Sequence, residues 1–162
     1  MSDERMEVQR TIAAEPAAIF AVLRDPHGHV SIDSSGMLMD ATGEPADAVG
    51  DRFTIHMDRE ALNDYPLGKY DVTIVITKFE PDREIAWTIE GVIQPPIRHV
   101  YGYTLEPVEG GTLVTSYYDW SNVNDEMKAI FPIIPESALR ATLGILDRTV
   151  ARGQAQSEGP DR

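Results

Sequence analysis

The contrast between the middle of the chain and its end constrains the fold more than any other feature of the sequence. Residues 69–79 are dense in β-branched side chains, and residues 84–90, 99–105 and 112–120 alternate between apolar and polar positions. Tight turns join these segments, which predicts an antiparallel meander. From residue 136 the period becomes that of a helix, because four apolar side chains are spaced four, three and four residues apart: Leu139, Leu143, Leu146 and Val150.

The first third of the chain predicts shorter elements. Residues 6–13 alternate as a strand does, Glu15-Pro16 is typical of a helix start, and Asp25-Pro26 ends that helix. A second helical turn is expected over residues 27–33, followed by strands at 37–40 and 52–58. The chain is therefore expected to be an α+β protein. Its curved antiparallel sheet of about seven strands would wrap around one long C-terminal helix, with two short helices after the first strand.

One domain is expected, because 162 residues is about the length of a single compact unit. The domain is predicted to span residues 1–153, with Gly153 ending the last helix and residues 154–162 forming a disordered tail. A single amphipathic helix cannot fill the concave side of a strongly curved sheet. We therefore expect a cavity between sheet and helix, lined by the inward side chains of the meander.

The chain carries 27 acidic and 14 basic residues, a net charge of −13. Such an acidic protein has no electrostatic basis for binding phosphates, so nucleic acids and anionic membranes are not expected as partners. Cysteine is absent from the sequence, which removes thiol chemistry and thiolate metal sites. The start is polar and acidic, and the longest apolar run, residues 17–23, is short, so we expect a cytoplasmic protein.

Several segments resemble a known superfamily. They are Glu15-Pro16-Ala17-Ala18-Ile19-Phe20, Val49-Gly50-Asp51-Arg52-Phe53, Phe79-Glu80-Pro81 with Ile85-Ala86-Trp87, and Leu105-Glu106-Pro107 with Gly111-Thr112-Leu113-Val114-Thr115. In this order and spacing the chain resembles the START-like helix-grip superfamily (SRPBCC) over residues 6–153, and more specifically its polyketide cyclase/dehydrase branch. The resemblance implies an internal cavity for a small hydrophobic molecule, which is polyketide-like, aromatic or lipidic. No cofactor is expected.

The resemblance does not fix the activity, because this superfamily includes cyclases, hydrolases, lipid and steroid carriers and hormone receptors. One hypothesis is a cyclase or dehydratase that folds a poly-β-keto chain and moves protons. The alternatives are a non-catalytic carrier or sensor that uses the same cavity, and a protein-interaction module. The expected partner is a small hydrophobic ligand. The sequence leaves open whether the chain is a monomer or a homodimer.

His29 and Asp33 are the first catalytic candidates, because a spacing of four on a helical turn puts both side chains on one face. A carboxylate that orients an imidazole is typical of a general base. The alternative is structural: Asp33 caps the turn by accepting amide hydrogens from the residues that follow, and His29 lies at the surface. Asp119 is the third candidate, but alternation points it away from Tyr118, so it would need a bulge to enter the cavity.

The ligand-binding candidates are side chains on strands expected to be adjacent, together with two from the segments that follow. They are Trp87, His99, Tyr101, Tyr103, Ser116, Tyr118 and Trp120 of the meander, with Phe131 and Leu143 after it. The resemblance implies that Tyr101 and Tyr103 point inward, where a hydroxyl group could donate to a developing enolate oxygen. His99 shares their parity but lies at a strand end, so we expect it at the cavity rim. The alternative for each ring is ordinary core packing.

His56 and Asp58 share one face of a strand and could bind a metal together with His29. Residues 53, 55 and 57 take the opposite, inward face, so no metal site is expected. Residues 123–135 form a hydrophobic insertion in which Pro132 and Pro135 prevent a continuous helix. We expect this insertion to be a lid over the cavity, with an association surface as the alternative.

Overall fold

The secondary structure of the chain comes from a computed structural model, which describes residues 4–62, 67–91, 93 and 95–158. The first half contains β1 (Arg5–Ile12), α1 (Pro16–Arg24), α2 (Pro26–Ile32), β2 (Leu38–Thr42), β3 (Arg52–Asp58) and a 3₁₀ turn, η1 (Glu60–Leu62). The second half contains β4 (Lys69–Glu80), β5 (Glu84–Glu90), β6 (Val100–Val108), β7 (Gly111–Asp119), α3 (Asp125–Lys128) and α4 (Glu136–Glu158).

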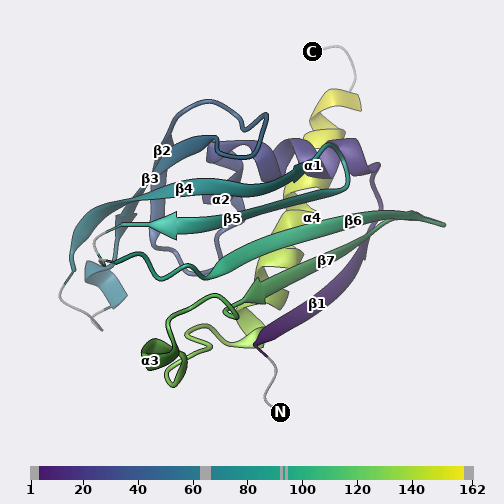
Figure 1. The fold of residues 1–162 in the computed structure, drawn as a ribbon. Coiled ribbons are helices and arrows are strands. Elements are labelled where there is room, and N and C mark those ends of the chain that lie inside the picture. The colour runs from purple at the N-terminus through teal and green to yellow at the C-terminus, as the bar shows by residue number, and fades with distance from the viewer. Residues whose placement is uncertain (1–3, 63–66, 92, 94, 159–162) are drawn as a thin grey trace.

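The strands form one antiparallel sheet in the order β1-β7-β6-β5-β4-β3-β2 (Figure 1). From β2 to β7 each strand pairs with its neighbour in sequence, while β1 joins the far edge beside β7, so that Val8 lies opposite Ser116. Shifts of register in β2 and, between Ile76 and Lys78, in β4 bend the sheet, as bulges do. The predicted α+β helix-grip architecture is confirmed.

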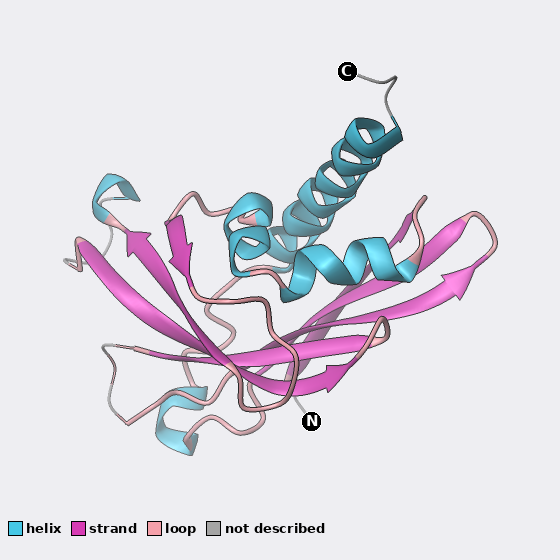
Figure 2. Ribbon diagram, turned by 90° about the horizontal axis from the view of Figure 1, so that it is seen from above, coloured by secondary structure: helices cyan, strands magenta, loops and turns pink. Residues whose placement is uncertain are grey.

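Helices α1, α2 and α4 cover one face of this sheet (Figure 2). Pro16 opens α1 and Pro26 opens α2, at positions where an amide hydrogen is not needed. A Cβ atom at Gly28 would lie 1.9 Å from the carbonyl oxygen of Val22. The close approach of α1 and α2 therefore requires glycine at position 28, and it brings α2 down over the sheet.

The core lies where α1 and the later turns of α4 pack on the sheet. Leu143, Leu146 and Val150 of α4 are all buried, at most 4% exposed. They share one cluster with apolar side chains of β1, α1, β5 and β7, including Ile12, Ile19, Phe20, Leu23, Ile85 and Val114. Burial of each leucine side chain stabilises the fold by about 1.5–3 kcal/mol, so this cluster holds the helices on the sheet.

The last helix is longer than the sequence predicts. It continues through Gly153 to Glu158, so the expected end of the helix at Gly153 is corrected and residues 154–158 are helical. Residues 159–162, the rest of the predicted tail, lie outside the described part of the chain. Glycine weakens a helix by roughly 0.5–1 kcal/mol relative to alanine. It does not end this helix, because the glutamine and alanine residues after it favour helical backbone.

Candidate functional site

A cavity of about 220 Å³ lies between the sheet and the helices. The sheet contributes inward residues of β3 to β7, and α2 contributes His29 and Ile32. The loop after α2 supplies Asp33 to Ser35 and Met37, and the start of α4 supplies Ala138, Leu139 and Thr142. The sheet residues include Ile55, Met57, Val72, Ile74, Trp87, Ile89, Tyr101, Tyr103 and Ser116. The expected cavity between sheet and helix is therefore present, and most of its wall is apolar.

Three aromatic side chains form one wall of this cavity. The ring of Trp87 is stacked with that of Tyr103, with centroids 5.8 Å apart and planes at 26°, and with that of Tyr101, at 6.3 Å and 13°. All three were predicted ligand-binding residues, and all three line the cavity. Because Trp87, Tyr101 and Tyr103 point to the same side of adjacent strands, they form one continuous aromatic surface beside the cavity.

The phenol groups of this wall are neutral near pH 7. Burial raises the pKa of Tyr103 to about 12, and a hydrogen bond with Ser116 opposes that rise. Burial likewise raises the pKa of Tyr101 to about 12, against the effect of a hydrogen bond with Tyr118. Ser116, another predicted ligand-binding residue, also lines the cavity. The wall thus offers hydroxyl groups that can donate or accept hydrogen bonds without carrying charge.

His29 is buried between α2 and the sheet, with 6% of its surface exposed. Its ring lies 4.5 Å from that of Trp87, and Nε2 is 2.8 Å from the carbonyl oxygen of Leu23, so Nε2–H is the donor and Nδ1 keeps its lone pair. Burial lowers the pKa of His29 to about 4, although the Leu23 carbonyl and the charge of Asp25 oppose the shift. The imidazole therefore lines the cavity as a neutral group.

Asp33 caps the turn after α2 and is not the partner of His29. Its Oδ1 accepts hydrogen bonds from the amide and the hydroxyl of Ser35, at 2.9 and 2.7 Å, and its Oδ2 accepts one from the amide of Leu38 at 3.2 Å. In the described part of the chain, the hydrogen bond expected between His29 and Asp33 is not formed. The capping interpretation holds for Asp33, but His29 is buried and does not lie at the surface.

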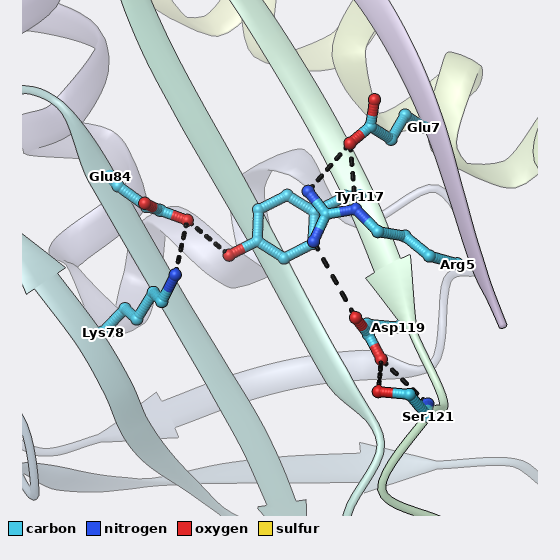
Figure 3. Close-up of polar contacts among 7 residues, drawn as sticks. All are labelled: Arg5, Glu7, Lys78, Glu84, Tyr117, Asp119 and Ser121. Atoms are coloured by element: carbon cyan, nitrogen blue, oxygen red, sulfur yellow. Dashed lines mark hydrogen bonds and ion pairs between the residues drawn. The ribbon is translucent and has the colours of Figure 1, made fainter.

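Asp119 lies on the face of the sheet opposite the helices (Figure 3). Its Oδ1 accepts hydrogen bonds from the amide and the hydroxyl of Ser121, and its Oδ2 is 3.8 Å from Nη1 of Arg5. The pairing of β6 with β7 runs without a shift of register to Asp119. Because the strand has no bulge there, Asp119 does not line the cavity, and its expected place in a catalytic site is corrected.

Five predicted ligand-binding residues lie behind the wall of the cavity. Tyr118 is 0% exposed and His99 is 5% exposed, so His99 is buried and the prediction that it lies at the rim is wrong. Leu143 belongs to the core of α4, Trp120 packs against Tyr118, and Phe131 meets the ring of His99 edge-on at 5.9 Å. None of these five is among the described residues that line the cavity.

Several lining residues were not singled out from the sequence. Ile55 was expected to face inward but was not a ligand-binding candidate. Val72, Ile74 and Ile89 follow the same inward parity as the aromatic wall, so alternation was the signal that could have found them. Ala138 and Thr142 lie beside Leu139 on one face of α4. Their small side chains carry no apolar signal, and only the packing of α4 reveals them.

His56 lies outside the cavity, with both ring nitrogens in contact with neighbouring side chains. Nδ1 is 2.8 Å from Asp71 and Nε2 is 2.7 Å from the hydroxyl of Thr42. Among the residues that the structure describes, no group of three or more potential ligands could hold a metal ion. Within the same residues, no helix has the length and hydrophobicity that crossing a bilayer requires.

The sequence matches the family described as polyketide cyclase / dehydrase and lipid transport over residues 3–151, and the chain belongs to this family. A comparison with curated proteins found no match. Among solved structures, a protein from Chromobacterium violaceum has a TM-score of 0.67 at 16% identity, covering 91% of this chain and 96% of that one. An AHSA1-like protein from Aeromonas hydrophila has a TM-score of 0.62 at 15% identity, and the match covers 98% of each chain. The Aha1 dimer from Colwellia psychrerythraea has a TM-score of 0.59 at 21% identity, and the match covers 93% of this chain and 98% of that one. These similarities show the fold alone.

Proposed function

We propose that the chain binds one small, ring-bearing hydrophobic molecule in the cavity beneath α2 and α4. The stacked wall of Trp87, Tyr101 and Tyr103 carries this proposal, because flat aromatic faces pack best against another flat apolar surface. An engineered cavity of about 150 Å³ in another protein holds benzene. A cavity of about 220 Å³ therefore has room for a molecule of one or two rings.

The lining favours an uncharged ligand. Asp33 is the one carboxylate among the described lining residues, neither lysine nor arginine is among them, and both carboxylate oxygens of Asp33 already accept hydrogen bonds. An anionic group inside the cavity would lose its hydration without gaining a positive partner from the wall. We infer that the ligand is held by apolar contact and by hydrogen bonds to neutral groups.

Binding without turnover agrees best with the state of the candidate catalytic groups. Burial lowers the pKa of His29 to about 4, so its imidazole is a weak base near neutral pH. Asp33 and Asp119 each accept hydrogen bonds from neighbouring groups. A carrier or sensor of a polyketide-like, aromatic or lipidic molecule is therefore our first candidate. A cyclase or dehydratase is the second, favoured by the fact that His29, Tyr101 and Tyr103 line one cavity.

Native mass spectrometry of the purified protein tests the proposal. We expect a retained molecule, seen as extra mass that is lost on denaturation, or else saturable binding of added naphthalene to ligand-free protein at one molecule per chain. The amide resonances that shift with naphthalene should be those of residues lining the cavity. The absence of both a retained molecule and saturable binding would contradict the proposal. Turnover of a poly-β-keto substrate that His29→Gln abolishes would favour the cyclase over the carrier.

A further inference from the structure

His99, Tyr118 and Tyr101 form a chain of hydrogen bonds that ends at the cavity. Nδ1 of His99 lies 2.6 Å from the hydroxyl oxygen of Tyr118. Tyr118 and Tyr101 are paired residues of β7 and β6, and their ring centroids are 4.6 Å apart, close enough for the two hydroxyl groups to share a hydrogen bond. Tyr101 lines the cavity, whereas Tyr118 and His99 lie behind it. The chain therefore connects a buried imidazole to a group that a ligand can touch.

This arrangement is costly if its only role is to fill the core. Apolar side chains of similar size would pack behind Tyr101 without the cost of burying polar groups. Arg98, the residue directly before His99, has a φ of 71°, in the left-handed region that is unfavourable for a residue with a side chain. Strained backbone of this kind gathers at functional sites. The buried polar groups and the strained backbone at Arg98 both point to a role for this hydrogen-bond chain beyond packing.

The side chains of His99, Tyr118 and Tyr101 are all uncharged near pH 7. Burial lowers the pKa of His99 to about 4 and raises that of Tyr101 to about 12. Burial also raises the pKa of Tyr118 well above its usual range, and the neighbouring Tyr101 adds to the rise. A neutral imidazole carries its proton on one of two nitrogens. The hydrogen bonds from His99 to Tyr101 can therefore point in either of two directions.

The two directions give the hydroxyl group of Tyr101 opposite roles. With the proton on Nδ1, His99 donates to Tyr118, Tyr118 donates to Tyr101, and the O–H of Tyr101 is left to donate into the cavity. With the proton on Nε2, Nδ1 accepts from Tyr118 and Tyr118 accepts from Tyr101. The oxygen of Tyr101 then accepts a hydrogen bond from the cavity.

We propose that this chain recognises a carbonyl, enol or phenol oxygen on the ligand. Tyr101 makes the contact, and His99 is a positioning residue that fixes, through Tyr118, whether Tyr101 donates or accepts. The inference rests on the proposed function and deepens it, because it names the ligand class as ring compounds bearing a ketone or a hydroxyl group. Hydrogen bonds in a chain polarise one another, so Tyr101 would bind such an oxygen more strongly than an isolated phenol would.

Paired titrations with 2-naphthol and naphthalene test the contact, because the two probes share their rings and differ in one hydroxyl group. A net hydrogen bond corresponds to roughly a 3- to 10-fold gain in affinity, and we expect wild type to prefer 2-naphthol by about that factor. Tyr101→Phe should bring the ratio of the two dissociation constants close to one, because each constant is compared within the same variant. A ratio that Tyr101→Phe does not alter would overturn the contact.

The role of His99 is tested by the same ratio in three further single variants and in one double variant, which combines Tyr118→Phe with His99→Leu. Tyr118→Phe keeps the ring but breaks the chain, and we expect it to lower the preference for 2-naphthol. His99→Leu should lower the preference equally and should add nothing in the double variant. His99→Asn should retain it, because the asparagine amide can donate or accept near the position of Nδ1. A preference that persists in Tyr118→Phe would overturn the positioning role.

Failure of the proposed function gives a different result from failure of the inference. If neither probe binds wild type, the cavity is not a binding site and the proposed function fails together with the inference. If both probes bind but their ratio is the same in wild type, Tyr101→Phe and Tyr118→Phe, only the inference fails. Should His99→Leu not fold, the two tyrosine variants still decide the outcome, because phenylalanine keeps the packing of each ring.

Discussion

At the scale of single residues, Gly102 shows how closely the outer face of the sheet is packed. The ring of Tyr117 lies over Gly102. The hydroxyl group of Tyr117 donates to Glu84 at 2.7 Å (Figure 3). The guanidinium of Arg5 lies 3.9 Å from the ring centroid on the same face. Position 102 therefore has no room for a side chain, although Gly102 is not one of the glycines with a positive φ.

We predict that Gly102→Ala destabilises the fold by about 1–3 kcal/mol, the usual cost of overpacking. The new Cβ atom would lie 2.2 Å from Cζ of Tyr117, and that ring is held by Glu84 and Arg5. Urea unfolding measures the change. Gly144→Ala is the matched control, because a Cβ atom there meets nothing within 4 Å. Since alanine favours a helix interior over glycine, this variant should raise the free energy of unfolding by up to about 1 kcal/mol. Equal stability of Gly102→Ala and wild type would contradict this packing.

His29 makes stability depend on pH. Its pKa is about 4 in the folded chain, against 6.5 for the free group, so the unfolded chain binds more protons between these values. The free energy of unfolding should therefore decrease as the pH falls from about 6.5 to 4, and His29 should account for roughly 3 kcal/mol of the decrease. In His29→Gln the loss over this pH range should be smaller, as measured by urea unfolding at several pH values. Identical pH profiles would contradict the assignment.

The sequence predicts the residues of the aromatic wall better than it predicts their polar partners. Alternation within a strand is local and places Tyr101 and Tyr103 on one side, and the family resemblance implies that this side is the inward one. Trp87, Tyr101 and Tyr103 all line the cavity. The partner of His29 depends instead on how α2 packs over α1, because that packing brings the carbonyl group of Leu23 to the imidazole. A spacing of four residues cannot reveal such a competitor for the hydrogen bond.

At the scale of elements, the segment from 123 to 135 divides its apolar side chains between the cavity and solvent. Ile134 lines the cavity and Phe131 packs on His99, whereas Ile130 and Ile133 are 65% and 48% exposed. The prolines predicted that no continuous helix would form, and only the short α3 does. Which isoleucine turns inward could not be predicted, because irregular backbone has no period.

We predict that Ile134→Ala weakens naphthalene binding several-fold and speeds its dissociation, because the variant removes part of the cover that a lid would provide. Ile133→Ala is the matched control, since its side chain is 48% exposed, and it should bind as wild type does. Line-shape analysis of the amide resonances measures the dissociation rate. A larger effect of Ile133→Ala, accompanied by a change in sedimentation, would favour an association surface over a lid.

At the scale of the whole molecule, side-chain size along α4 decides where the cavity lies. The start of this helix places Ala138 and Thr142 over the sheet, whereas Leu143, Leu146 and Val150 fill the space further along. The order of the seven strands and of helices α1, α2 and α4 could be predicted from the sequence, whereas η1 and α3 were not. The need for a cavity could also be predicted, because one helix is too small to cover the sheet. The size and position of the cavity follow from packing that no local pattern encodes.

A pair of phenylalanine substitutions on α4 decides whether this cavity binds a small ring-bearing molecule. Ala138 lines the cavity and Ala141, three residues along, is exposed. The measurement is the dissociation constant of naphthalene for wild type, Ala138→Phe and Ala141→Phe. We expect Ala138→Phe to lower the affinity by at least about 10-fold, or about 1.4 kcal/mol, and Ala141→Phe to leave it unchanged. Equal binding by both variants and wild type would contradict this expectation.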